Sequence, residues 1–130
     1  MTTLGIRRVL HATYDQALAR VPEALKSEGF GVLTEIDLQA TLKQKLGVEF
    51  RRYTILGACN PPFAHEALQA ELEVGLILPC NVVVYEDDDR RAVVLMIDPT
   101  KTMASTGNPK LLELAESVKA KLTRALAKAE

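Results

Sequence analysis

The chain has too few cysteines and too little net charge to belong to several familiar classes of protein. Only two cysteines occur in 130 residues, which excludes a small scaffold held together by disulfides. Sixteen lysines and arginines oppose 17 aspartates and glutamates, so there is no basic field to hold a polyanion, and we expect no nucleic-acid partner. Hydrophobic residues make up 48% of the chain and charged residues 25%, a balance that excludes collagen and a disordered chain.

Long hydrophobic runs are also missing. Residues 53–64 and 74–85 are uncharged stretches of twelve residues each, and both contain proline. A membrane-spanning helix needs about 20 apolar residues, so we expect no membrane partner. The first eight residues hold no apolar core of a signal peptide. We therefore expect a cytoplasmic protein with two free thiols.

No low-complexity linker and no repeat of 20–50 residues divides the sequence. A length of 130 residues suits one domain, since domains cluster near 100–150 residues. The expected organisation is a single α+β domain over residues 1–130.

Local signals mark where the helices begin. In a capping box, Thr13 can accept an early helical N–H bond while Gln16 reaches back to the backbone of Thr13. Capping side chains recur before three further helices, at Asp37, Asn60-Pro61 and Asn108-Pro109. Pro22 falls inside the first helix and predicts a kink or a restarted helix. Residues 100–107 are polar, and we expect them to form a loop.

Segments rich in β-branched and apolar residues predict the strands, over residues 4–10, 30–37, 52–59, 81–86 and 91–98. The order is therefore β-α-β-α-β-α-β-β-α. This alternation favours an α+β fold with a mixed β-sheet and packed helices.

Two of the strands, residues 82–84 and 93–97, are continuously apolar. Strands of that kind are normally covered on both faces. Helices could cover both faces of these strands. Alternatively, a second copy of the chain could cover one face, so we expect a homodimer as one possible state.

A repeated dipeptide is the main candidate for a functional site: Cys59-Asn60 and Cys80-Asn81. The first copy lies where a strand ends and a helix begins at Pro61, so the helix dipole would favour the thiolate of Cys59. Backbone N–H groups at that helix start and the two asparagine amides could bind a carbonyl or an oxyanion. The alternative is structural, because free cysteine is often buried and asparagine often caps helices.

Other chemistry is less well supported by the sequence. The two cysteines are 21 positions apart and do not form the close pairs of a zinc site, so we expect no metal. A disulfide depends on a distance that the sequence does not give. His65 lies one turn after Cys59 and could serve as a base, although a surface histidine is the simpler reading. Asp98 could bring a carboxylate to the same sheet edge or could cap the backbone.

Three functions stay open on these residues. The first is small-ligand binding at a corner made by Cys59, Asn60, Pro61, Cys80 and Asn81, with Asp98 nearby. The second is thiol-dependent catalysis or redox chemistry at Cys59 or Cys80. The third is an interaction module in which the cysteines only pack. The sequence names no cofactor, and it contains none of the common nucleotide-binding, hydrolase or zinc-protease motifs.

The same segments resemble the family called domain of unknown function 302. The resemblance rests on residues 29–33, 56–61, 78–82 and the Asp98-Pro99 pair, and it runs over about residues 5 to 100. It implies a small, compact α+β protein of bacterial or archaeal type that forms dimers. The family has no established activity to carry over. Its two Cys-Asn corners correspond here to Cys59-Asn60 and Cys80-Asn81.

Overall fold

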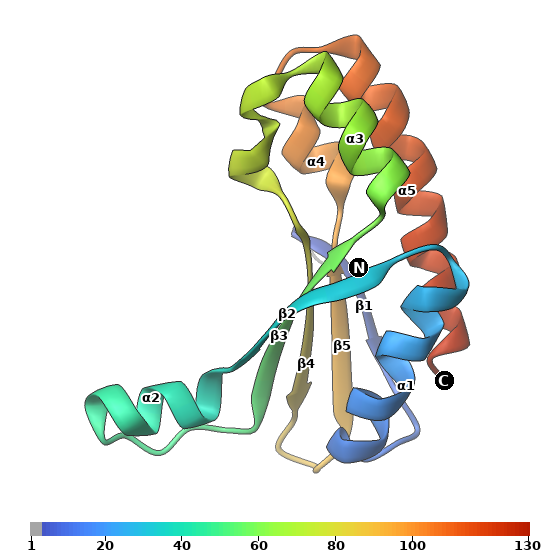
Figure 1. Cartoon of the computed structure of the whole chain (residues 1–130). Helices are drawn as coiled ribbons and strands as arrows, with labels where there is room; N and C mark the ends of the chain where they lie inside the picture. Colours follow the sequence, from blue (N-terminus) through green and yellow to red (C-terminus); the bar gives the residue numbers. More distant parts are fainter. Residues whose placement is uncertain (1–3) are drawn as a thin grey trace.

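A computed structural model describes residues 4–130 of the chain. Its centre is one five-stranded sheet in the order β1-β5-β4-β3-β2 (Figure 1). The strands are β1 (Gly5–Val9), β5 (Ala92–Ile97), β4 (Cys80–Glu86), β3 (Tyr53–Cys59) and β2 (Gly31–Asp37).

The α+β class is confirmed, and the elements follow roughly the predicted order. The sheet is antiparallel throughout, whereas a mixed sheet was expected. The reason is that β1 and β2, the two strands joined by the first helix, lie at opposite edges of the sheet and do not pair. Each later connection reverses the chain direction, so every neighbouring pair is antiparallel.

Helices α1 (Tyr14–Ser27) and α5 (Pro109–Lys128) pack on one face of the sheet (Figure 1). Helices α3 (Pro61–Ala70) and α4 (Pro99–Ala104), with the 3-10 helix η1 (Leu72–Ile77), gather at one end. Side chains of the sheet and of α1 and α5 meet in the core, which includes Leu56, Val82, Val84, Val94, Met96, Val21, Leu25, Val118 and Leu122.

The capping signals predicted the helix starts correctly. The Thr13 hydroxyl accepts the backbone N–H of Gln16 at 3.2 Å, and the Gln16 side chain accepts the Thr13 N–H at 3.0 Å. Asp37, Asn60 and Asn108 each cap the helix that follows.

Two local expectations need correction. Helix α1 is one continuous helix through Pro22, so no second helix restarts there, because Val21 and Leu25 on either side of it are fully buried and the packing holds the helix together. Residues 99–104, expected in large part to be loop, form α4, because Asp98 caps it and Met103 is buried against the core.

Alternation along the strands leaves the second sheet face apolar. Its residues are half-buried, and α1 and α5 lie across the sheet from them (Figure 1). We call this surface the open face; its central residues are Tyr53, Ile55, Val83, Tyr85, Leu95 and Ile97.

Helix α2 (Leu38–Leu46) projects away from the sheet together with the segment that returns to β3 (Figure 1). We call residues 38–50 the arm. None of the nine residues of α2 is buried, and all seven residues of β2 at the base of the arm are exposed. Helix α2 therefore buries no side chain against the sheet, and the arm contacts the sheet at its root, where the ring centroids of Phe50 and Tyr53 lie 6.1 Å apart.

Candidate functional site

A cavity of about 280 Å³ lies at the end of the sheet, between the β3–α3 junction and the η1–β4 junction. We call it the corner cavity. Its polar and sulfur-bearing residues are Cys59, Asn60 and Cys80. The remaining lining is apolar and comes from Leu33, Ala58, Phe63, Ala64, Leu68, Gly75, Leu78 and Pro79.

The predicted site residues divide into two groups in the structure. Cys59, Asn60 and Cys80 line the corner cavity together, although 21 positions separate the two cysteines. Pro61 occupies the first position of α3, where it is exposed and does not line the cavity.

Asn81 and Asp98 also lie outside the corner cavity. Asn81 pairs with Gly57 across the sheet and is exposed beside a hollow of about 180 Å³ on the open face. Adjacent strand residues point to opposite faces, and here Cys80 lines the corner cavity while Asn81 borders the hollow on the open face. Asp98 is 1% exposed, caps α4 and forms an ion pair with Lys119 of α5 at 3.0 Å, so it links α4 to α5.

The side chain of Asn60 caps a helix through its oxygen atom. Its side-chain oxygen accepts the backbone N–H of Phe63 at 3.3 Å and so caps α3. The residue is 8% exposed. Gly29, with φ of +87°, lies against its amide nitrogen, since a Cβ on that glycine would come within 3.2 Å. The cap uses the side-chain oxygen of Asn60, and its amide nitrogen lies beside Gly29.

Cys80 is buried, with 5% of its surface exposed. Burial, and secondly the nearby Cys59, raise the pKa of the Cys80 thiol to about 11. At neutral pH Cys80 is therefore a neutral thiol and a poor nucleophile. Cys59 is half-buried at the cavity and is the more accessible sulfur.

Gly57 and Pro79 shape the wall beside the two cysteines. A Cβ at Gly57 would lie 2.3 Å from the Thr34 hydroxyl oxygen and 2.9 Å from Cγ of Pro79. The missing side chain allows β2 and the loop before β4 to close on β3. The cavity that results is mostly hydrocarbon with one amide and two sulfurs, a lining suited to a small apolar body with a polar group at one end.

Comparison with known proteins gives one family. Residues 6–129 match the model of a domain of unknown function, DUF302. The chain belongs to the DUF302 family. A solved structure of an uncharacterised conserved DUF302 protein from Bacillus stearothermophilus is 30% identical in sequence. The match covers 99% of this chain and 100% of that one, with a TM-score of 0.92. No curated protein matches the chain.

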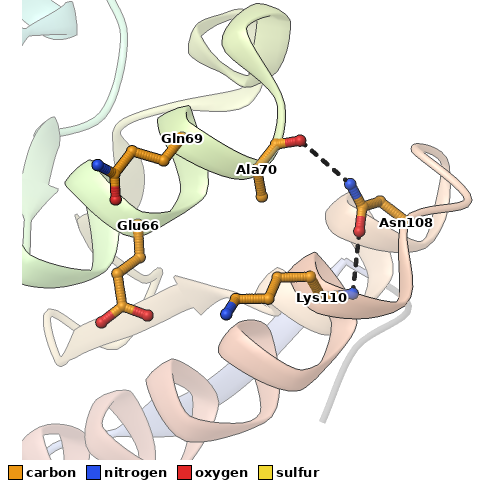
Figure 2. Close-up of a pocket in the computed structure, with 5 residues that line it drawn as sticks. All are labelled: Glu66, Gln69, Ala70, Asn108 and Lys110. Atoms are coloured by element: carbon orange, nitrogen blue, oxygen red, sulfur yellow. Dashed lines mark hydrogen bonds between the residues drawn. The ribbon is translucent and has the colours of Figure 1, made fainter.

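The DUF302 chain has a second, polar cavity that sequence reasoning missed. It has a volume of about 560 Å³ and is lined by Glu66, Gln69 and Ala70 of α3 and by Asn108 and Lys110 at the start of α5 (Figure 2). The Asn108 amide donates to the Ala70 carbonyl at 3.3 Å, and its oxygen accepts the Lys110 N–H at 2.9 Å. Asn108 thus joins two helices, which the Asn-Pro signal alone could not indicate.

The described part of this DUF302 chain places His65 away from the corner cavity and holds neither a cluster of three or more metal-ligating side chains nor a helix able to span a membrane. His65 is exposed on α3 and does not line the corner cavity. Residues 4–130 contain no group of three or more His, Cys, Asp and Glu side chains able to hold a metal ion. No helix within that range is long and apolar enough to cross a bilayer.

Proposed function

We propose that this DUF302 protein binds a small, largely apolar ligand in the corner cavity. The observation that carries the proposal is that Cys59, Asn60 and Cys80, from two distant Cys-Asn segments, line the same cavity. Its volume of about 280 Å³ lies just below the range of about 300–1,000 Å³ typical of ligand sites, so the ligand is small.

The lining defines the chemistry of that ligand. Phe63, Leu68 and Leu78 offer hydrocarbon contact to an aliphatic or aromatic body. The Asn60 amide would donate a hydrogen bond to a carbonyl or hydroxyl oxygen and so fix the orientation of the ligand. No charged side chain lines the cavity, which disfavours a strongly anionic ligand.

Thiol-dependent catalysis is the second candidate, and it is favoured by the half-buried position of Cys59 at the cavity. Cys80 is unsuited to the role of nucleophile because its raised pKa keeps it neutral. His65 is exposed and away from the cavity, so the base that would activate Cys59 is missing from the lining. These observations favour binding over catalysis.

We further propose that the functional unit is a cytoplasmic homodimer. Two free cysteines suit a reducing compartment. The apolar strands β4 and β5 have helices on one face only, which leaves the open face for a second copy.

The binding proposal is tested by titrating the protein with fluorobenzene and 4-fluorophenol and observing the fluorine NMR signal. We expect both probes to bind, and the phenol to bind more tightly because Asn60 can donate to its oxygen. Ala64→Leu fills the cavity wall and should weaken binding at least tenfold. Ala120→Leu makes the same change on an exposed site of α5 and should have no effect.

Cys59→Ser tests whether binding of the probes depends on the Cys59 thiol. A binding site should keep its affinity for the probes within a few fold, since the serine side chain has nearly the same shape. A wild-type protein that binds neither probe, or an Ala64→Leu variant that binds as well as wild type, would refute the binding proposal.

A further inference from the structure

Two apolar surfaces are largely uncovered within residues 4–130, and they meet where Phe50 of the arm contacts Tyr53 of the open face. The first is the open face, where the rings of Tyr53 and Tyr85 stack with centroids 5.7 Å apart. Beside them, Val83, Leu95 and Ile97 border a shallow apolar hollow. Two arginines flank this apolar centre: Arg51 lies 5.9 Å from the Tyr85 ring centroid, and Arg7 pairs with Leu95 across β1 and β5. Aromatic and aliphatic residues with arginine beside them are typical of an interface.

The second surface is the arm with its base. Three apolar residues of the arm are well exposed, with Leu46 at 69%, Val48 at 43% and Phe50 at 41%. At the base of the arm, Ile36 of β2 is 45% exposed and pairs with Ile55 of the open face, whereas Leu33, which is 67% exposed, lines the corner cavity. So many exposed apolar residues within one short segment mark a contact surface.

The arm needs support that the single chain does not supply. A helix of nine residues is too short to be stable in water on its own, and α2 buries no residue against the body. Capping by Asp37 and the left-handed Gly47 fix its ends and do not replace packing. The arm must therefore be held by something that is present whenever the chain is folded.

We infer that these two surfaces are the two halves of a homodimer interface, in which the arm of each copy lies across the open face of the other. The inference rests on the proposed homodimer and specifies its geometry. A two-fold axis makes each copy donate one arm and receive one, so both bare surfaces of both copies are covered by one symmetric contact.

The extent of the two surfaces fits a stable dimer. The arm has 13 residues. With Ile36 and the six residues of the open face, each copy presents about 20 residues, the lower end of the roughly 20–30 per side of a standard interface. A second copy is the occupant that supplies both surfaces in equal number. An unrelated partner would have to cover each of them separately.

The first test measures oligomeric state by sedimentation velocity. We expect wild type to sediment as a dimer and Leu46→Asp to raise the dimer dissociation constant at least tenfold. Leu46 contacts no buried core in its own chain, so circular dichroism of the variant should keep the helix and strand content of the body. Leu112→Asp, an exposed leucine on α5 across the sheet from the open face, is the control and should stay dimeric.

The second test fixes the geometry. Chains carrying Leu46→Cys are mixed with differently tagged chains carrying Leu95→Cys, both with Cys59→Ser to remove the accessible native thiol. Oxidation should yield the mixed disulfide between arm and open face. A monomeric wild type would overturn both the homodimer and this arrangement. A dimer unaffected by Leu46→Asp, or one that cross-links only between two open faces, would overturn the arrangement and leave the homodimer standing.

Discussion

At the scale of single residues, the corner cavity depends most on a missing side chain. Gly57 lies in β3 between two neighbours, β2 on one side and β4 on the other. Thr34 and Pro79 close over it from those two sides, and there is no room for a methyl group. Protein interiors are packed too densely to absorb such a group without movement.

We expect Gly57→Ala to lower the free energy of unfolding by about 1–3 kcal/mol, the usual effect of overpacking. It should also disturb the corner cavity, since Pro79 lines it. Urea denaturation measures the loss. Gly31→Ala is the matched control, because nothing lies within 4 Å of the added Cβ, and it should be neutral or slightly stabilising. Equal stability of the two variants would contradict the packing argument.

The two cysteines should differ sharply in reactivity. With a pKa of about 11, roughly one Cys80 thiol in a thousand is ionised at pH 8. Half-buried Cys59 should therefore be alkylated by iodoacetamide first, and Cys80 at least about 100-fold more slowly than a free thiol. Mass spectrometry of tryptic peptides at increasing times separates the two rates. In 8 M urea both cysteines should react alike, and a fast Cys80 in the folded protein would show that the buried position is wrong.

At the scale of elements, capping residues carried most of the predictive information. Thr13, Asp37, Asn60 and Asn108 begin helices because their side chains bond the first free N–H groups, an interaction confined to three or four residues. The Asp98-Pro99 pair gives the same signal. The polar residues after it show no apolar periodicity, and α4 is only six residues long, so the sequence could not distinguish it from a loop.

The pairing of elements was less predictable than their positions. The predicted fourth strand began at Asn81, whereas β4 begins at Cys80. That one residue decides the site, because within a strand Cys80 and Asn81 face opposite sides of the sheet. The convergence of Cys59 and Cys80 was predictable as a hypothesis from the repeated dipeptide. Their depth of burial depends on the whole sheet and was not.

Helices α4 and α5 are joined by the ion pair between Asp98 and Lys119. Burial alone would raise the pKa of Asp98, but hydrogen bonds from Thr100 and Lys119 outweigh it and lower that pKa. A carboxyl whose pKa is lower in the folded protein stabilises it above its unfolded pKa, near 4, and the stabilisation disappears as pH falls through the folded value.

We therefore expect Asp98→Asn to cost about 1–3 kcal/mol of unfolding free energy at pH 7 and to differ little from wild type near pH 2. Thermal unfolding followed across that pH range provides the measurement. Asp88→Asn is the control. This aspartate has a 92% exposed side chain and pairs with Arg51 only at the surface, where an ion pair contributes little, so the variant should stay within about 1 kcal/mol of wild type at every pH. A loss for Asp98→Asn that does not vary with pH would mean that the capping geometry matters and the charge does not.

At the scale of the whole molecule, the arm and the open face were visible in the sequence only as separate hints. Continuously apolar strands indicated a need for covering on both faces, and the sequence could not say whether helices or a second copy would cover them. The structure places both large helices on one face (Figure 1). Coverage of the other face depends on contacts between elements far apart in sequence, which no local pattern encodes.

Removing the arm gives the most direct prediction about the assembled protein. Residues Asp37 and Thr54 are paired across β2 and β3, so an Asn-Gly turn can join them in place of residues 38–53, none of which is buried. The change removes Tyr53 of the open face, with Arg51 and Arg52, together with the arm, and so takes away parts of both halves of the proposed interface. Because a dimer that unfolds to two chains gains stability with concentration, the melting temperature of wild type should rise by several degrees between about 1 and 100 µM. The shortened chain should fold as a monomer with a melting temperature that does not depend on concentration. A concentration-dependent melt in the shortened chain would mean that the copies associate through another surface, and an unfolded shortened chain would mean that the arm supports its own body more than its exposure indicates.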